Sequence, residues 1–328
     1  MAMENKKISK IGVLTSGGDA PGMNAAIRAV VRTAVFNGIR VMGIRKGYDG
    51  LINGDIIELK SRDVSEIINR GGTILHTARS EEMRTDEGIK KAAQIYDILG
   101  LDALVVIGGD GSFRGCLELS KHGVNVVGIP GTIDLDMNCT EYTIGFDTAV
   151  NTGADAINRL RDTSSSHERC SVIEVMGRNA GYIAYWCALV GGAEEVLVPE
   201  KLDEVTKKNV IEQVLENRSI GKHHNLIIVA EGVGGSQALA EDIQRITGIE
   251  TRATILGHLQ RGGSPTAIDR MHASVMGYMA VEEILKGGRN FVVAFNKGRH
   301  EIINIENALA MPPKPDTGLY KIIKTLSV

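Results

Sequence analysis

Four short, continuously hydrophobic segments of the chain predict buried β-strands. They read KIGVLT at 10–15, ALVVIGG at 103–109, NVVGIPG at 125–131 and NLIIVAEG at 225–232. Uninterrupted apolar runs are typical of parallel strands that are covered on both faces. Each segment ends in glycine or a small polar residue, and three of them precede residues that can start a helix. The pattern predicts an α/β protein with mainly parallel sheets, in which ligands bind at the carboxyl ends of strands.

The length and the charge narrow this picture. The chain has 328 residues, of which 43% are apolar, so we expect two domains or one large α/β unit with a substantial core. Its 37 Lys and Arg residues and 40 Asp and Glu residues give a net charge of −3. A nucleic-acid-binding surface typically needs a basic excess, so no nucleic-acid partner is predicted.

The cysteines and the apolar segments indicate the compartment. Cys116, Cys139, Cys170 and Cys187 are irregularly spaced and form no CxxC pair, which favours free thiols in a reducing compartment over a zinc site. The first apolar run, IGVL, is too short for a signal peptide, and no run reaches the 18 or so residues of a membrane span. We therefore expect a cytoplasmic protein without a membrane partner.

Two glycine-rich turns are candidates for phosphate binding. In LTSGGDAPGMNAAIR, Gly17 and Gly18 let the backbone approach a ligand, and Asn24 could cap the following helix. In VIGGDGSFRG, Asp110 lies among glycines and Ser112 could cap the next helix. A helix N-terminus offers N–H groups to an anion, and a nearby carboxylate can hold the magnesium ion of a nucleotide. Ordinary tight turns are the alternative for both.

Neither turn matches the two common nucleotide-binding patterns. The sequence contains no G-x-x-x-x-G-K-[ST], which excludes a P-loop protein. No G-x-G-x-x-G follows the first predicted strand, which argues against a dinucleotide-dependent dehydrogenase.

The segment GTIDLD, residues 131–136, places Asp134 and Asp136 one residue apart. In an extended segment both carboxylates would face one side and Leu135 the other. One carboxylate could accept a proton from an attacking hydroxyl, and the other could orient a metal-bound water, as phosphoryl transfer requires. The alternative is an Asx turn that caps a helix from 137 onward.

Several arginines follow in turns, where they could bind phosphate with their rigid fork of donors. They are Arg169, Arg178, Arg252 and Arg261, and His258 lies in the same region. Taken alone, an arginine is more often part of a surface salt bridge, and a lone histidine is more often structural.

Taken together and in order, these segments resemble bacterial ATP-dependent 6-phosphofructokinases. The resemblance runs from residue 11 to about 270 and is weaker beyond 290; its motifs are GVLTSGGDAPGMNAAIR, INRGGT, DALVVIGGDGS, IPGTID, YTIGFDTA, RLRDTSSSH, EVMGR and ETRATILGHLQRGGSP. The resemblance implies two Rossmann-like three-layer α/β/α domains, with the active site in the cleft between them. It implies a larger ATP-binding domain at 1–145 and 259–305, and a smaller sugar-phosphate-binding domain at 146–258 and 306–328.

The resemblance also implies a reaction: ATP phosphorylates the 1-hydroxyl of fructose 6-phosphate to give fructose 1,6-bisphosphate, a step of glycolysis. Asp134 matches the family's catalytic base, and Thr132 and Arg178 match residues that meet the transferring phosphoryl group. Asp110 matches the aspartate associated with Mg²⁺. The ATP site is matched by Gly18, Tyr48, Arg79, Ser80, Arg84, Gly109, Asp110, Gly111, Ser112 and Gly115. The sugar-phosphate site is matched by Thr132, Asp134, Asp136, Arg169, Met176, Gly177, Arg178, Glu231, Arg252, His258 and Arg261.

The resemblance extends to quaternary structure and regulation. Arg169 and Arg252 resemble residues that a neighbouring subunit lends to the site, which implies a homotetramer. The family also binds ADP or phosphoenolpyruvate between subunits, and Arg28 and Arg32, spaced i,i+4 on one predicted helix face, match that effector site. Its other matching residues are Arg161, Gly192, Glu194, Lys222, His223 and His224.

Some positions bear on the alternatives. Pyrophosphate-using relatives typically have Asp where this chain has Gly111 and Lys where it has Gly131, so ATP is the expected donor. Leu135 replaces the Asn that is usual in the family, which leaves a catalytically weakened regulatory paralogue as another alternative. In the effector site, Ile220 replaces an expected lysine, and an arginine is missing near Ser61, although Arg62 is adjacent.

Overall fold

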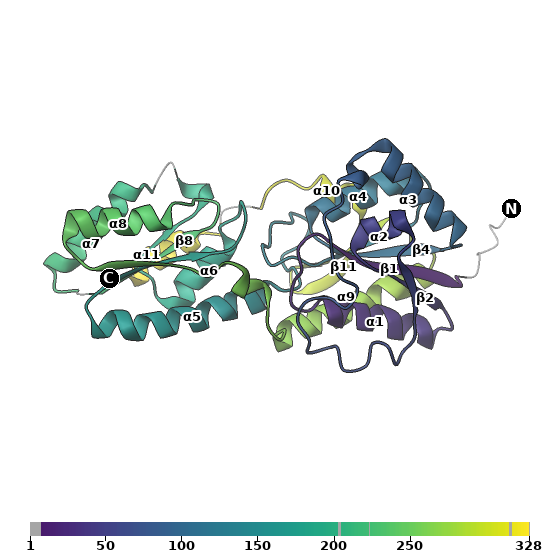
Figure 1. Cartoon of the computed structure of the whole chain (residues 1–328), viewed down its shortest axis with the longest axis horizontal. Coiled ribbons are helices and arrows are strands. Elements are labelled where there is room, and N and C mark those ends of the chain that lie inside the picture. Colours follow the sequence, from purple (N-terminus) through teal and green to yellow (C-terminus); the bar gives the residue numbers. More distant parts are fainter. Residues whose placement is uncertain (1–7, 203–204, 223, 315–316, 328) are drawn as a thin grey trace. The chain divides into compact units, whose positions relative to one another are not determined.

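The computed structural model describes residues 8–202, 205–222, 224–314 and 317–327. The chain divides into two compact units, each with its own sheet (Figure 1). Unit 1 consists of Met1–Thr132, Met137–Asp147 and Arg261–Pro313. Unit 2 consists of Ile133–Asp136, Thr148–Gln260 and Lys314–Val328. The domain boundaries implied by the resemblance stay a prediction.

Unit 1 is built on a seven-stranded sheet in the order β11-β10-β5-β4-β1-β2-β3. The inner strands are parallel, whereas β3 and β11 pair antiparallel at the two edges. The strands are β1 (Lys10–Ser16), β2 (Arg40–Ile44), β3 (Ile56–Leu59), β4 (Ala103–Gly108), β5 (Val126–Pro130), β10 (Phe291–Asn296) and β11 (Arg299–Asn304).

Helices cover both faces of this sheet, with α1 and α9 on one face and α2, α3 and α4 on the other (Figure 1). A Cβ on Gly277 of α9 would lie 2.7 Å from the Cβ of Ala29, so glycine at 277 allows α9 to approach α1 closely. The helices are α1 (Met23–Phe36), α2 (Gly47–Asn53), α3 (Asp86–Ile98), α4 (Asp110–Lys121), α9 (Ala267–Leu285) and α10 (Ile305–Leu309).

Unit 2 contains a four-stranded, wholly parallel sheet in the order β7-β8-β6-β9. Helices α7 and α8 lie over one face and α5 over the other (Figure 1). The strands are β6 (Cys170–Val175), β7 (Glu195–Leu197), β8 (Asn225–Ala230) and β9 (Thr251–Ile255). The helices are α5 (Phe146–Ser166), which begins in unit 1, α6 (Tyr182–Gly191), α7 (Lys207–Ser219), α8 (Ser236–Thr247) and α11 (Leu319–Leu326).

The predicted α/β fold with mainly parallel sheets is confirmed. The four apolar runs form β1, β4, β5 and β8, and every residue of β4, β5 and β8 is buried. Among the described residues, no helix is long and apolar enough to cross a membrane.

The strand order of unit 1 contains a switch point between β1 and β4. β1 and β4 are neighbours, yet the chain leaves β1 through α1 toward β2 and leaves β4 through α4 toward β5, on the opposite side. In open α/β sheets, ligands bind at such a switch point, beyond the carboxyl ends of the strands. The two glycine-rich turns directly follow β1 and β4, so both belong to this edge of the sheet.

Candidate active site

The two glycine-rich turns of unit 1 contact each other. The hydroxyl of Ser112, in the first turn of α4, donates to the carbonyl of Ser16 at the end of β1 over 3.1 Å. A Cβ on Gly108 would lie 2.5 Å from Ser112 Oγ and 2.7 Å from the Ser16 carbonyl oxygen, so only glycine fits there without rearrangement. The turns therefore form one continuous backbone surface at the switch point, as a phosphate chain would require.

Two predicted helix caps are wrong. The N-cap of α4 is Gly109, and Ser112 lies inside the first turn, where its hydroxyl donates to the carbonyl of Ser16. The N-cap of α1 is Gly22, and Asn24 lies inside the helix. The Asn24 amide donates to the carbonyls of Arg70 and Gly71, both over 3.1 Å, and its oxygen accepts from the amide of Ile74 over 2.8 Å. Because glycine has no side chain to cap with, both helix N-termini leave donors that an anion could use.

Tyr48 packs against the first turn of α4 and hydrogen-bonds to it. Its buried hydroxyl donates to the carbonyl of Ser112 over 2.6 Å and lies 3.3 Å from Cys116 Sγ. Burial raises the pKa of Tyr48, and Cys116 adds to this shift, so the phenol stays protonated and keeps donating. A Cβ on Gly115 would lie 2.9 Å from the tyrosine ring, which accounts for glycine on this helix face.

Asp110 is the carboxylate that the second glycine-rich turn carries. It lies in the first turn of α4 and is paired with Arg114, one helical turn later, over 2.7 Å. The described residues hold no group of three or more His, Cys, Asp or Glu side chains able to bind a metal by themselves. Mg²⁺ is commonly bound through one or two carboxylates, substrate phosphates and waters, and this arrangement fits that mode.

The turn after β1 and the segment around residues 79–84 carry further candidates. Arg261 donates to the carbonyl of Asp19 over 3.2 Å, and a Cβ on Gly18 would lie 2.5 Å from its guanidinium. Arg261, matched to the sugar-phosphate site, is thus in contact with the glycine-rich turn after β1. Ser80 accepts from the amide of Met83 over 3.3 Å, and the exposed Arg84 pairs with Glu81 over 3.1 Å. Arg79 is exposed.

In unit 2 a pocket lies at the carboxyl ends of β6, β8 and β9. It brings together Met176, Glu231 and His258, all matched to the sugar-phosphate site, and is also lined by Glu174 and Ile255. Three segments far apart in sequence meet there because their strands are parallel neighbours. The buried Gln260 accepts from the amide of Met176 over 2.8 Å, which fixes the loop that follows β6.

Arg178 and Asp136 approach each other in unit 2. Their guanidinium and carboxylate are 4.0 Å apart, and the Arg178 side chain is 65% exposed, so it remains free to meet a ligand. The backbone of Arg178 adopts the left-handed conformation, with φ of 55°. The carboxylate of Glu231 accepts from the Arg178 amide over 3.1 Å and stabilises this turn.

The segment that carries Asp134 is not extended. The expectation that Asp134 and Asp136 face one side of an extended strand is therefore wrong. Leu135 has a φ of 55°, which is uncommon for a residue with a branched side chain, and it is only 7% exposed. Its carbonyl accepts from Nζ of Lys314 over 2.8 Å. Asp134 is 5% exposed. No helix begins at 137 in the described segment 131–145, so the capping alternative is wrong.

Glu250 is a functional candidate that the sequence reasoning missed. It pairs with both Arg169 and Arg252, each over 2.8 Å, and so holds the two arginines matched to a neighbouring subunit's site side by side. Hydrogen bonds from Arg169 and then Arg252 hold the pKa of Glu250 below its ordinary value. Its position directly before β9, two residues from Arg252, was the available signal.

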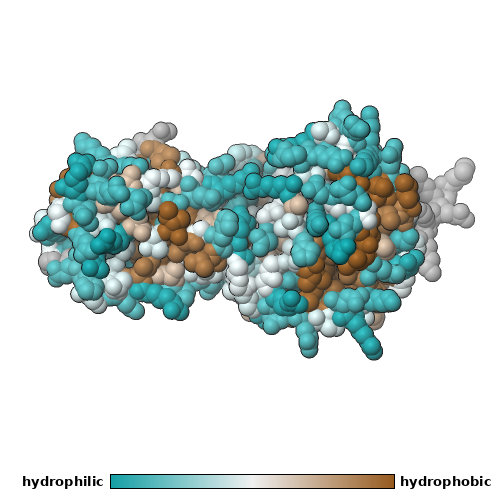
Figure 2. All heavy atoms as spheres, viewed as in Figure 1, coloured by the Kyte–Doolittle hydropathy of each residue, from teal (hydrophilic) through white to brown (hydrophobic). Residues whose placement is uncertain are grey.

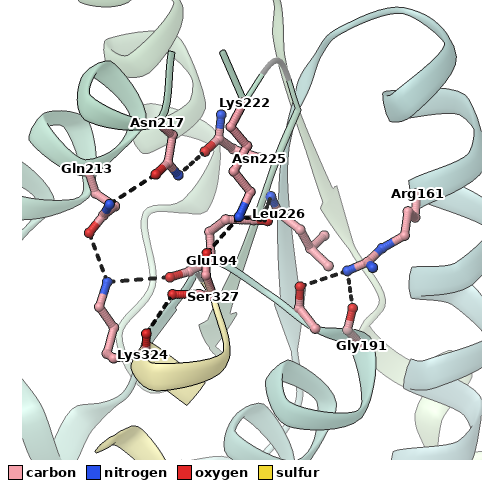
Figure 3. A network of polar contacts seen from close by, with 11 residues as sticks. Arg161, Gly191, Glu194, Gln213, Asn217, Lys222, Asn225, Leu226, Lys324 and Ser327 are labelled. Carbon is pink, nitrogen blue, oxygen red and sulfur yellow. Dashed lines mark hydrogen bonds and ion pairs between the residues drawn. The ribbon is translucent and has the colours of Figure 1, made fainter. Parts of the chain in front are cut away.

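Four effector-site candidates of unit 2 make polar contacts in two groups, Lys222 with Glu194 and Arg161 with Gly192 (Figure 3). Lys222 pairs with the buried Glu194 over 3.0 Å and donates to the carbonyl of Ser327 over 2.7 Å. Arg161 donates to the carbonyls of Gly191 and, over 2.8 Å, of Gly192. Lys324 of α11 pairs with the buried Glu195 over 3.0 Å. Lys324 of α11 and Ser327 therefore belong to the group around Lys222 and Glu194, which the sequence did not indicate.

The remaining effector candidates are Arg28, Arg32, His223 and His224. Arg28 and Arg32 are on α1 of unit 1, where burial and the charge of Arg32 lower the pKa of Arg28. Ile220 is 76% exposed. His224 directly precedes β8, and His223 lies outside the described residues.

Comparison with known proteins identifies the family. The phosphofructokinase family model matches residues 10–284. The chain belongs to the phosphofructokinase family. It is 58% identical to an ATP-dependent 6-phosphofructokinase from Clostridium botulinum over 317 residues, which cover 97% of this chain and 99% of that protein. A homologue named in the same way from Clostridium tetani is 58% identical over 318 residues, covering 97% of this chain and 99% of that protein.

Solved structures agree on the fold. Phosphofructokinase from Saccharomyces cerevisiae is 32% identical with a TM-score of 0.85, covering 97% of this chain and 47% of the yeast chain. This chain thus spans about half the length of the yeast protein. A pyrophosphate-dependent phosphofructokinase from Marinobacter aquaeolei is 20% identical with a TM-score of 0.82, covering 97% of this chain and 91% of that one. At that identity, the likeness shows a shared fold only.

The backbone at Leu135 leads to a test of stability. Leu135→Gly and Leu135→Ala remove the same buried side chain, but only glycine is unstrained at this φ. We expect the free energy of unfolding, measured in urea, to be about 1 kcal/mol higher for the glycine variant than for the alanine variant. The same pair at Ile133, which has no positive φ, should show the ordinary order, with alanine more stable. Alanine being the more stable at both positions would contradict a strained Leu135.

Proposed function

We propose that this chain is an ATP-dependent 6-phosphofructokinase, which transfers a phosphoryl group from Mg-ATP to the 1-hydroxyl of fructose 6-phosphate. The observation that carries the proposal is the site geometry of the two units. Unit 1 presents two joined glycine-rich turns at a strand switch point, and unit 2 presents Met176, Glu231 and His258 around one pocket. The 58% identity over 97% of the chain supports the same activity.

Asp134 is the general base in this proposal. Its carboxylate would accept the proton of the attacking 1-hydroxyl, and its burial keeps water from competing for that position. Asp136 lies close to the Arg178 guanidinium, so one carboxylate of the pair is partly neutralised while the other serves the hydroxyl. The two aspartates can therefore coexist on one short segment.

Thr132, Arg178 and Asp110 serve the phosphoryl group. A Cβ on Gly109, the N-cap of α4, would lie 3.6 Å from the Cβ of Thr132, so Thr132 stands next to the phosphate turn. Arg178, with its exposed guanidinium, would stabilise negative charge on the transferring group. Asp110 would hold Mg²⁺, which supplies charge neutralisation on the phosphates when bound.

The donor is ATP rather than pyrophosphate in this proposal. A Cβ on Gly111 meets no described atom within 4 Å, so there is open space beside this residue in the first turn of α4. Pyrophosphate-using relatives typically have Asp at this position, and glycine would leave that space to the rest of ATP. Purified chain should consume Mg-ATP only when fructose 6-phosphate is present, as followed in a coupled assay for ADP. Little turnover is expected with Mg-pyrophosphate, and the reverse preference would contradict the proposal.

The weakened-paralogue alternative depends on Leu135 alone. Asparagine tolerates a positive φ better than leucine, so the usual family residue suits the observed backbone. If the leucine only strains the loop, Leu135→Asn changes kcat by less than about tenfold. This corresponds to a change of less than ~1.4 kcal/mol in the activation free energy. A wild-type rate at background that Leu135→Asn rescues by orders of magnitude would favour the paralogue.

The role of Asp134 is tested with an isosteric variant. Asp134→Asn keeps the shape of this buried side chain but cannot accept the proton. We expect kcat to fall roughly 10²–10⁴-fold with little change in the KM for ATP, measured by steady-state kinetics. Binding of ATP to the variant, measured by calorimetry, serves as the folding control. A variant that keeps most of the wild-type kcat would exclude Asp134 as the base.

We further propose a homotetramer that is regulated by ADP or phosphoenolpyruvate. Hydrophobic side chains are gathered in patches on the viewed face (Figure 2), and exposed apolar residues occur on α6 and α11 at Trp186, Val190, Ile322 and Leu326. Such patches are typical of protein interfaces. Arg161 and Lys222 would bind the anionic effector. The four buried free thiols suit a cytoplasmic location.

Shared active sites make a distinct prediction. If Arg252 reaches the sugar phosphate of a neighbouring subunit, Asp134→Asn chains and Arg252→Ala chains are inactive alone but complement each other. Hybrids formed by co-expression should regain activity, because some sites then combine an intact Asp134 with an intact Arg252. Native mass spectrometry checks that hybrids form. Hybrids that form without any regained activity would contradict shared sites.

A further inference from the structure

The loop between β6 and α6, residues 176–181, carries Arg178 in a conformation that the loop alone does not favour. Gly177 has a φ of 144° and Arg178 a φ of 55°. Left-handed backbone is uncommon for arginine, so the surroundings must hold it in place. A turn from the amide of Ala180 to the carbonyl of Gly177, over 2.9 Å, closes the loop internally.

Two carboxylates from other segments hold this loop at both ends. Glu231, which follows β8, accepts from the amide of Arg178 over 3.1 Å. Glu200, in the short helical turn Pro199–Lys201 after β7, accepts from the amide of Gly181 over 2.8 Å. Hydrogen bonds from backbone amides to an ionised carboxylate are stronger than neutral ones. Glu231 lines the sugar-phosphate pocket, whereas Glu200 does not belong to its lining.

The contact between Glu200 and the loop is tight. A Cβ on Gly181 would lie 2.6 Å from a carboxylate oxygen of Glu200 and equally close to Val198. A Cβ on Gly232 would lie 2.5 Å from the carbonyl oxygen of Arg178 and 2.8 Å from Cγ of Pro199. Segment 198–200 therefore packs directly against the backbone of the loop, and a shift of Glu200 would be passed to Arg178.

We infer that Glu200 is a positioning residue for phosphoryl transfer: its carboxylate clamps the amide of Gly181 and so fixes where the Arg178 guanidinium stands. The inference rests on the proposed role of Arg178. Glu200 itself need not touch either substrate. Misplacing a catalytic group by about 1 Å can cost roughly 10²-fold in rate, so a residue of this kind affects kcat without contributing to chemistry.

The test compares Glu200→Ala with Glu200→Gln in the full-length chain. Alanine removes the acceptor, whereas glutamine keeps an oxygen that can accept from Gly181. We expect Glu200→Ala to lower kcat about 10²-fold with the KM for ATP nearly unchanged, and Glu200→Gln to recover most of that loss. Glu216→Ala, which removes an exposed carboxylate of α7 in the same unit, is the control and should keep the wild-type kcat.

A second measurement needs no turnover. Hydrogen exchange of peptides that cover 176–182 should quicken in Glu200→Ala and stay near the wild-type rate in Glu200→Gln. A purely structural role would lower Tm but leave kcat per folded molecule intact, and that result would overturn the inference. So would equal losses of kcat in both variants, or unchanged exchange in Glu200→Ala. A wild-type chain that turns over neither donor would instead count against the proposed function, and the exchange comparison would still decide the clamp.

Discussion

The parallel pairing of strands is the constraint on which both parts of the candidate site depend. In unit 1, pairing β1 with β4 brings two turns almost 100 residues apart in sequence into hydrogen-bonding contact, through Ser16 and Ser112. In unit 2, pairing β6 with β8 and β9 gathers Met176, Glu231 and His258 around one pocket. Parallel strands end at a common edge, so residues placed directly after them meet without any long insertion.

Sequence patterns predicted what depends on burial and on local spacing. β4, β5 and β8 were recognisable because every residue in them is buried, which makes their apolar runs continuous. β9, by contrast, carries the sequence TRATI and is half exposed, and β11 lies at an edge and is mostly exposed. Such strands form because they pair with neighbouring strands in the sheet, and their own sequences carry only a weak strand signal.

The caps and the Asp134 segment failed as predictions because distant partners decide them. Ser112 and Asn24 are good capping residues, but the first is recruited by β1 and the second by the loop at 70–74. Leu135 would be expected to continue an extended segment, yet its backbone turns left-handed and its carbonyl is held by Lys314, 179 residues later. Local propensity gives way where long-range hydrogen bonds compete for the same groups.

The same competition explains how unit 2 keeps two uncommon backbone conformations in or beside residues to which the proposed function gives a part in phosphoryl transfer. Leu135 and Arg178 both have a φ of 55°, and each is held by a charged partner from elsewhere in the fold, Lys314 and Glu231. In the same unit, the carboxylate of Asp136 lies 4.0 Å from the guanidinium of Arg178. Strain at such positions persists only when the surroundings fix it. In the proposed function, the held backbone would place the charged side chains before the substrate arrives, so that they need no reorganisation when the phosphoryl group moves.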